Sequence, residues 1–180
     1  MRRRVLLLGA AVLAACTPSL GTFDALAPRD PGVRRVVRDA AYGPASRQHI
    51  DVYAPTAAAD GPRPIIVFIY GGSWSSGAKD DYEFMGAALA SQGFVVALPD
   101  YRLVPSVRFP TFVEDCATAV RWVHDHASEF GGDPNRIVLM GHSAGAYNAM
   151  MLALDTHYLG DAGVGASAIR GAIKTRLFPA

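Results

Sequence analysis

The sequence predicts a single α/β domain in which buried strands alternate with helices around a mostly parallel sheet. Continuous apolar runs of strand length, such as Ile65 to Tyr70 and Phe94 to Leu98, stand between segments of helical periodicity. Strands that alternate with helices pair in parallel through right-handed crossovers. The chain has 180 residues, of which 51% are hydrophobic, and this suffices for one sizeable core but argues against two domains.

The amino terminus has the pattern of a secretory signal. Arg2, Arg3 and Arg4 precede the apolar run Val5 to Ala15. As a helix this run would rise only about 16 Å, against about 30 Å for the hydrocarbon core of a bilayer. A charged start, a short apolar run and small residues together predict a signal peptide over residues 1–15.

The apolar run ends in Leu13-Ala14-Ala15-Cys16, which resembles the bacterial lipobox. The resemblance implies cleavage before Cys16, a lipid anchor on Cys16, and a place in the cell envelope on the periplasmic or extracellular face of a bacterial membrane. The alternative is an ordinary signal peptide with a chance cysteine. Residues 16–32 are rich in Pro, Ala and Gly, and we expect them to form a tether to a domain over residues 33–180.

The first strands of the domain are expected to form an antiparallel hairpin. Two short β-rich segments, Arg34 to Tyr42 and Gln48 to Tyr53, are separated by the turn signal Gly43-Pro44. The next strand, Ile65 to Tyr70, is apolar throughout and is expected to be buried on both faces.

Helical patterns follow each of the later strands. A helix is expected from Asp80 to about Gln92, and the longest helix begins near Pro110. The apolar residues of this long helix recur at spacings of three and four: Phe109, Val113, Cys116, Val120, Val123, Ala127 and Phe130. Cys116 lies on this face, so we expect a small core residue rather than a nucleophile.

The last elements are a strand over Ile137 to Met140, a helix from Ser143 to about Leu154, and a further strand that begins with Ile169 to Ile173.

The charges of the chain nearly cancel, with 17 basic against 16 acidic residues, so no nucleic-acid partner is expected. No metal-ligand cluster or phosphate-binding loop occurs in the sequence, and neither a metal nor a cofactor is expected. The sequence does not indicate an oligomeric state.

The motif Gly141-His142-Ser143-Ala144-Gly145 stands between that strand and that helix. Strand, sharp turn and helix are the context of the G-x-S-x-G nucleophile elbow. A side chain at Gly141 or Gly145 is expected to collide with the neighbouring strand or helix. The start of a helix also presents free amides and a partial positive charge, so the amide of Ala144 is expected to face an oxyanion.

A second glycine-rich loop, Tyr70-Gly71-Gly72-Ser73-Trp74, follows the strand Ile65 to Tyr70. Glycines allow the backbone to approach a substrate oxygen, and the loop after this strand supplies the second oxyanion donor in α/β-hydrolases. We therefore assign the remaining donors to the amides of Gly72 and Ser73.

These motifs together resemble the α/β-hydrolase carboxylesterases, in the branch of the hormone-sensitive-lipase-like, feruloyl-esterase-like and kynurenine-formamidase-like hydrolases. The matching stretches are Asp51 to Pro55, Tyr70 to Trp74, Gly77, Lys79, Pro99 to Leu103, Phe109-Pro110, Gly131 to Pro134, and Gly141 to Gly145. The resemblance implies an α/β-hydrolase fold and hydrolysis of a small-molecule ester through an acyl-enzyme on Ser143.

The resemblance also assigns supporting residues. Trp74 is expected near the pocket wall, His142 to brace a loop, and Asp100 and Arg102 to pair with each other or with nearby backbone. Tyr70 departs from the family, which usually has histidine before Gly-Gly to brace the oxyanion loop.

The triad acid and base are not apparent in the sequence. After Ser143 the candidates are Asp155, His157 and Asp161, of which the first two would stand roughly 18–20 Å from the serine along a helix. A base must come within about 3 Å of the proton that it takes. We therefore expect a partial α/β-hydrolase domain that lacks its C-terminal strands, with the acid and base outside this chain. The alternative is a lipid-anchored, catalytically inactive fragment or binding protein.

Overall fold

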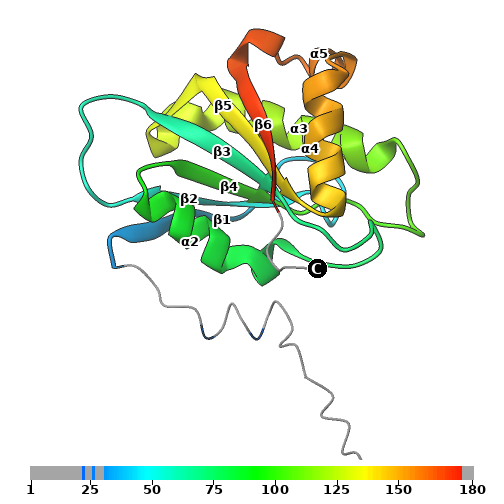
Figure 1. Cartoon of the computed structure of the whole chain (residues 1–180), viewed down its shortest axis with the longest axis horizontal. Coiled ribbons are helices and arrows are strands. Elements are labelled where there is room, and N and C mark those ends of the chain that lie inside the picture. Colours follow the sequence, from blue (N-terminus) through cyan, green and yellow to red (C-terminus); the bar gives the residue numbers. More distant parts are fainter. Residues whose placement is uncertain (1–21, 23–25, 27–30, 176–180) are drawn as a thin grey trace, which may run out of the picture.

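The computed structural model describes residues 22, 26 and 31–175 (Figure 1). The predicted signal peptide, the lipidation site at Cys16 and nearly all of the tether lie outside the described residues, so these predictions stay predictions. In the part that is described, no helix has both the length and the apolar character needed to cross a membrane.

Within residues 31–175, six strands form one mixed sheet in the order β1-β2-β4-β3-β5-β6. β2 pairs antiparallel with β1 and β4, and the other pairs are parallel, so the predicted N-terminal hairpin and mostly parallel sheet are confirmed. The strands are β1 (Val33–Ala41), β2 (His49–Pro55), β3 (Arg63–Ile69), β4 (Val95–Pro99), β5 (Gly132–His142) and β6 (Ile169–Thr175).

The three predicted helices are present with small differences at their ends. The helical elements are the 3-10 turn η1 (Lys79–Tyr82), α2 (Glu83–Ser91), α3 (Thr111–His126), η2 (Ala127–Phe130), α4 (Ala144–Leu154), α5 (His157–Asp161) and η3 (Ala166–Ala168). Neither α5 nor η3 was predicted, and His157 lies in α5 rather than on the helix that follows Ser143. Phe109 is an exception to the predicted apolar face of α3, because its side chain is 53% exposed. Pro110 caps the helix, so Phe109 precedes it and leaves the helical register.

The order of the strands explains where a site can form. From β3 the chain crosses the sheet towards β1 to form β4, and from β4 it crosses back past β3 towards β6 to form β5. Right-handed crossovers then place α2 on one face of the sheet and α3 and α4 on the opposite face. α2 packs on β2 and β4, whereas α3 and α4 pack on each other and on β5 (Figure 1). After β3 and after β5 the chain therefore turns to opposite faces of the sheet. A crevice forms between the carboxyl ends of these two adjacent strands.

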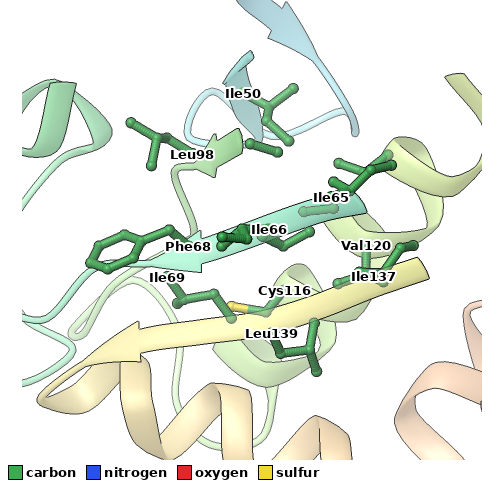
Figure 2. Close-up of a cluster of buried hydrophobic side chains, with 14 of the residues drawn as sticks. Ile50, Ile65, Ile66, Phe68, Ile69, Leu98, Cys116, Val120, Ile137 and Leu139 are labelled. Carbon is green, nitrogen blue, oxygen red and sulfur yellow. The ribbon is translucent and has the colours of Figure 1, made fainter. Parts of the chain in front are cut away.

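The core lies where α3 and α4 cover the centre of the sheet. Figure 2 shows Cys116 and Val120 of α3 beside Ile137 and Leu139 of β5, and all four side chains are fully buried. Burial raises the pKa of the Cys116 thiol, which keeps it protonated. The prediction that Cys116 is a core residue is confirmed.

Candidate active site

Ser143 lies at the junction between β5 and α4, in the crevice defined by the strand order. Its backbone has φ 53° and ψ −118°, a conformation that costs a residue with a side chain of order 1–3 kcal/mol. The Ser143 carbonyl accepts the amides of Ala146 at 3.0 Å and Tyr147 at 3.2 Å. The first turn of α4 is thus built directly on the strained serine.

The glycines on either side of Ser143 are required by space. A β-carbon on Gly145 would lie 2.0 Å from the Ile69 carbonyl oxygen of β3, and one on Gly141 would lie 2.4 Å from the Gly145 carbonyl oxygen. Backbone atoms cannot rotate away from such contacts as a flexible side chain can. The collisions expected from the sequence are therefore confirmed.

The loop after β3 comes directly against the serine. A β-carbon on Gly71 would lie 2.8 Å from the His142 carbonyl oxygen and 2.9 Å from Ser143 Cβ. Three successive residues then have positive φ, namely Gly72 at 126°, Ser73 at 52° and Trp74 at 57°. The loop closes on itself, because the amides of Ser75 and Ser76 donate to the Gly72 carbonyl at 3.0 and 3.1 Å.

The three residues whose amides were assigned from the sequence, Gly72, Ser73 and Ala144, are not in the described lining of the cavity at Ser143. Among the described residues, no acceptor pairs with the amides of Gly72, Ser73 or Ala144. The Ala144 amide is one of the four that the start of a helix leaves without a partner, and it carries the positive end of the α4 dipole.

A cavity of about 410 Å³ opens at Ser143 and is lined by His142, Ser143, Ala146, Lys174 and Thr175. The last two residues were not assigned to the site from the sequence, which predicted only that a strand begins with Ile169 to Ile173. β6 instead continues to Thr175 and pairs Lys174 with Gly141. A lysine is tolerated there because β6 is the edge strand of the described sheet and Lys174 is exposed.

A larger cavity, of about 610 Å³, lies at the opposite end of the sheet, where Arg34, Arg63 and Glu129 contribute to its lining. It is bounded by the amino ends of β1 and β3, by the carboxyl end of the antiparallel strand β2, and by the turn before β5. Ligands of open α/β sheets bind beyond the carboxyl ends of the strands. The smaller cavity at Ser143 is therefore the candidate active site.

His142 lines the cavity but is held by another side chain. Its Nδ1 lies 2.9 Å from the Tyr82 hydroxyl of η1, as expected for a histidine that braces a loop. Burial lowers the pKa of His142, because the charged imidazolium loses solvation.

The other four histidines lie away from the cavity. His157 Nδ1 is 2.6 Å from Asp155 Oδ1, and both side chains are about half exposed, as expected from the sequence. His124 and His126 belong to α3, where His126 stacks on Trp122. His49 begins β2, which three strand spacings, or about 14 Å, separate from β5. Within the described residues, His142 is thus the only imidazole that lines the cavity.

Trp74 packs into an aromatic cluster between α3 and α4 rather than on the described lining of the cavity. Its indole donates to Asn148 Oδ1 at 2.9 Å and stacks on Phe112 with ring centroids 5.5 Å apart. The ring of Tyr147 meets it edge-on at 5.4 Å. This cluster fixes the end of the loop that carries Gly72 and Ser73.

The expected pair of Asp100 and Arg102 does not form. Arg102 makes a two-pronged contact with the buried carboxylate of Asp115, at 2.6 Å from Nη2 and 2.9 Å from Nε. Asp100 instead accepts the backbone amide of Lys79 at 2.8 Å, which fits the alternative of a contact with nearby backbone.

One acidic cluster has the spacing of a metal site. Carboxylate oxygens of Asp51, Asp80 and Glu83 lie within 4.8 Å of one another. Two cationic side chains already bridge them: Lys79 Nζ is 3.2 Å from Asp51 and 3.0 Å from Asp80, and Arg35 Nη1 is 2.8 Å from Asp51 and 2.6 Å from Glu83. The cluster therefore holds η1 and α2 against the hairpin.

Comparison with known proteins places the chain in a family. The BD-FAE family model matches residues 50–164. Isoprenylcysteine alpha-carbonyl methylesterase ICME of Arabidopsis thaliana is 39% identical over 122 residues, which are 68% of this chain and 28% of that protein. Carboxylesterase NlhH of Mycobacterium tuberculosis is 36% identical over 125 residues, which are 68% of this chain and 39% of that protein.

Solved structures agree with this placement. A bacterial heroin esterase is 33% identical, with a TM-score of 0.67, and the match covers 81% of this chain and 45% of that one. Esterase B from Lactobacillus rhamnosis has a TM-score of 0.71 at 24% identity, over 83% of this chain and 48% of that one, and supports the fold alone. The chain thus spans less than half the length of these relatives. The chain belongs to the BD-FAE family and has the α/β-hydrolase fold of the carboxylesterases.

Proposed function

We propose that Ser143 is the nucleophile of a carboxylic ester hydrolase that works through an acyl-enzyme. The observation that carries the proposal is the strained Ser143 backbone, with Gly71 packed against its side chain and the unpaired amides of Gly72, Ser73 and Ala144 on the two adjoining loops. Esterases among the relatives support an ester of a small molecule as the substrate class.

The proposed reaction has two steps. Ser143 Oγ attacks the ester carbonyl while a base takes its proton, and the oxygen that becomes negative is held by the three amides. One such donor is typically worth about 3–4 kcal/mol of the barrier. The base then gives that proton to the oxygen of the departing alcohol. The alcohol leaves as the carbonyl re-forms on Ser143, and water then attacks the acyl-enzyme to release the acid and regenerate the hydroxyl.

We infer that the acid and base of the triad come from outside these 180 residues. All five histidines are described, and four of them lie away from the cavity, while His142 is bonded to Tyr82. The oxyanion hole and binding alone leave roughly 10³–10⁴-fold catalysis over water when a triad member is missing. The chain by itself is therefore expected to be a slow esterase.

A fluorophosphonate probe tests the nucleophile. Prolonged incubation is expected to add one phosphonyl group to Ser143, located by peptide mass, and Ser143→Ala should abolish it. Ser106→Ala, which changes a serine outside the cavity lining, is the matched control and should label like the parent chain. Equal labelling of parent and Ser143→Ala would exclude Ser143 as the nucleophile.

The second candidate is a catalytically silent binding protein, and the absence of a second imidazole from the described cavity lining favours it. Turnover of a short-chain p-nitrophenyl ester separates the two candidates. Turnover that disappears in Ser143→Ala rejects the silent protein, whereas binding of the ester without any turnover rejects the hydrolase.

The membrane anchor is a separate proposal. We propose that Cys16 carries lipid and holds the domain at the outer or periplasmic face of a bacterial membrane. Several acyl chains give stable anchoring, because each buried methylene contributes about 0.8 kcal/mol. Cys16→Ser should move the protein from the membrane fraction to the soluble fraction. Retention of Cys16→Ser in membranes would reject lipidation at this residue.

A further inference from the structure

One side chain from the turn between β1 and β2 reaches both ends of the loop that carries Gly72 and Ser73. Arg47 Nη2 donates to the Tyr70 hydroxyl at 2.7 Å, before the glycines, and to the Gly77 carbonyl at 2.8 Å, after them. Its Nε donates to the Tyr101 carbonyl at 3.0 Å, at the end of β4. The guanidinium thus ties the loop to the neighbouring strand.

The contacts of Arg47 lie on rigid partners. Tyr70 and Tyr101 are fully buried and stack with ring centroids 4.6 Å apart. The Tyr101 hydroxyl also donates to the Tyr70 carbonyl at 2.9 Å. A ring stack and a hydrogen bond from side chain to backbone thus hold the two residues together. A guanidinium is a planar fork with fixed directions, so it transmits the position of one partner to another.

The loop end at Gly77 is coupled to the residue that faces the serine. A β-carbon on Gly77 would lie 2.7 Å from the Gly71 carbonyl oxygen, and Gly77 has φ +97°. Gly71 in turn lies against Ser143. A displacement of Gly77 or Tyr70 therefore moves Gly71 and the two amides that follow it.

A partly buried carboxylate, that of Asp100, completes the group. Asp100 Oδ1 lies 3.5 Å from Arg47 Nη2 and accepts the amide of Lys79, which follows the loop. Burial raises the pKa of Asp100, and the neighbouring Arg47 charge opposes that shift.

We propose that Arg47 is a positioning residue that sets the direction of the Gly72 and Ser73 amides, a role that rests on the proposed function of those amides. In the sequence, Tyr70 stands where the family usually has the histidine that braces this loop. The structure divides this task, since the Tyr70 phenol fills the core and Arg47 makes the polar contacts.

Backbone hydrogen exchange of the full chain, followed by NMR, tests the brace without any need for turnover. The reporters are the amides of Ser75, Ser76 and Lys79, which are hydrogen-bonded within the loop or to Asp100. In Arg47→Gln their exchange is expected to rise about tenfold, the factor that corresponds to about 1.4 kcal/mol. Core amides of Val67 and Val120 should keep their protection, which separates a local effect from global destabilisation.

Two further variants sharpen the result. Arg63→Gln is the matched control, because Arg63 also donates to two carbonyls, those of Ala57 and Gly93, but at the far end of the sheet. It should leave the three reporters unchanged. Arg47→Lys keeps the charge and loses the fork, so it should resemble Arg47→Gln. Restored protection in Arg47→Lys, or unchanged protection in Arg47→Gln, would overturn the proposal.

Tyr70→Phe provides a test that does not depend on the folding of an Arg47 variant. It removes one acceptor of Arg47 and keeps the stacked ring, and it should raise exchange at the reporters by a few-fold. Combined with Arg47→Gln it should add nothing further, because both changes break the same contact. Full additivity would contradict the brace. A parent chain that is never phosphonylated at Ser143, although its loop amides are protected as expected, would instead reject the proposed nucleophile and leave the brace supported.

Discussion

Gly71 and Ser143 are packed so closely that a β-carbon on the glycine would lie 2.9 Å from Cβ of the serine. The two residues are 72 positions apart in the sequence and follow adjacent strands, β3 and β5. Because the chain leaves these strands in opposite directions, their loops meet only at the carboxyl edge of the sheet. The proposed nucleophile and its proposed oxyanion donors are thus brought together by strand order.

Gly145→Ala should test this packing most severely, because the added methyl group would lie 2.0 Å from the Ile69 carbonyl oxygen. We expect a loss of about 3 kcal/mol in the free energy of unfolding, the upper end of the usual cost of overpacking. Urea denaturation measures it. Gly61→Ala is the control, since no atom lies within 4 Å of its added carbon. Equal stability of the two variants would contradict the close approach of α4 to β3.

Ser143→Gly should stabilise the fold by about 1 kcal/mol relative to Ser143→Ala. Glycine relieves the strain at φ 53°, worth about 1–3 kcal/mol, and loses up to about 1 kcal/mol through the entropy of the unfolded chain. Alanine keeps the β-carbon and hence the strain. The two variants are compared by thermal and urea unfolding, and a less stable glycine variant would show that the serine backbone is not strained.

Asp115 is expected to matter far more to stability than Asp125. The Asp115 side chain is 1% exposed and accepts Arg102 and the buried Gln48, so Asp115→Ala should cost about 3–5 kcal/mol. Asp125 is 39% exposed in an i,i+4 pair with Arg121, so Asp125→Ala should cost less than about 1 kcal/mol. Similar costs in urea denaturation would mean that the Arg102 contact contributes little.

His142 and His157 should titrate on opposite sides of the ordinary histidine pKa of 6.5. Burial lowers the pKa of His142, whereas the hydrogen bond to Asp155 raises the pKa of His157. One NMR titration of the imidazole protons reports both, and the reverse order would contradict the burial of His142.

The His142 shift also has a consequence for stability. A lowered pKa in the folded state means that the unfolded chain binds more protons as the pH falls. The contribution of His142 to the free energy of unfolding is therefore present above pH 6.5 and is lost as the pH falls below it. His142→Asn should remove this part of the pH dependence. A contribution that instead grows below pH 6.5 would reverse the assigned direction.

The elements and the serine turn could be predicted because their signals are local. Ser143 sits between two glycines, after an apolar strand and before a helical run, and each of these patterns spans only a few residues. The extension of β6 through Lys174 was not predicted, because charged residues are rare in the apolar strands of such a sheet, whereas β6 is the edge strand of the described sheet. Whether Lys174 belongs to β6 depends on the register of that strand with β5. The local sequence of the segment does not specify this register.

The contacts of Arg47 could not be predicted for a different reason. They join residues 23 to 54 positions apart, and no spacing in the sequence indicates that one guanidinium meets both Tyr70 and Tyr101. The same holds for Arg102, whose partner is Asp115 of α3 rather than the nearby Asp100. A long polar side chain pairs with the groups that folding brings close to it. Those neighbours are set by the assembled sheet and not by spacing in the sequence.

The most direct test of the account is an NMR spectrum of the chain after phosphonylation of Ser143. The tetrahedral phosphonyl oxygen stands in for the oxyanion, so hydrogen bonds to it should move amide protons downfield. We predict the largest downfield shifts at Gly72, Ser73 and Ala144, with little change at Val67 and Val120 in the core. A phosphonyl group on Ser143 that leaves these three amides unshifted would contradict the central claim that the two loops form one site.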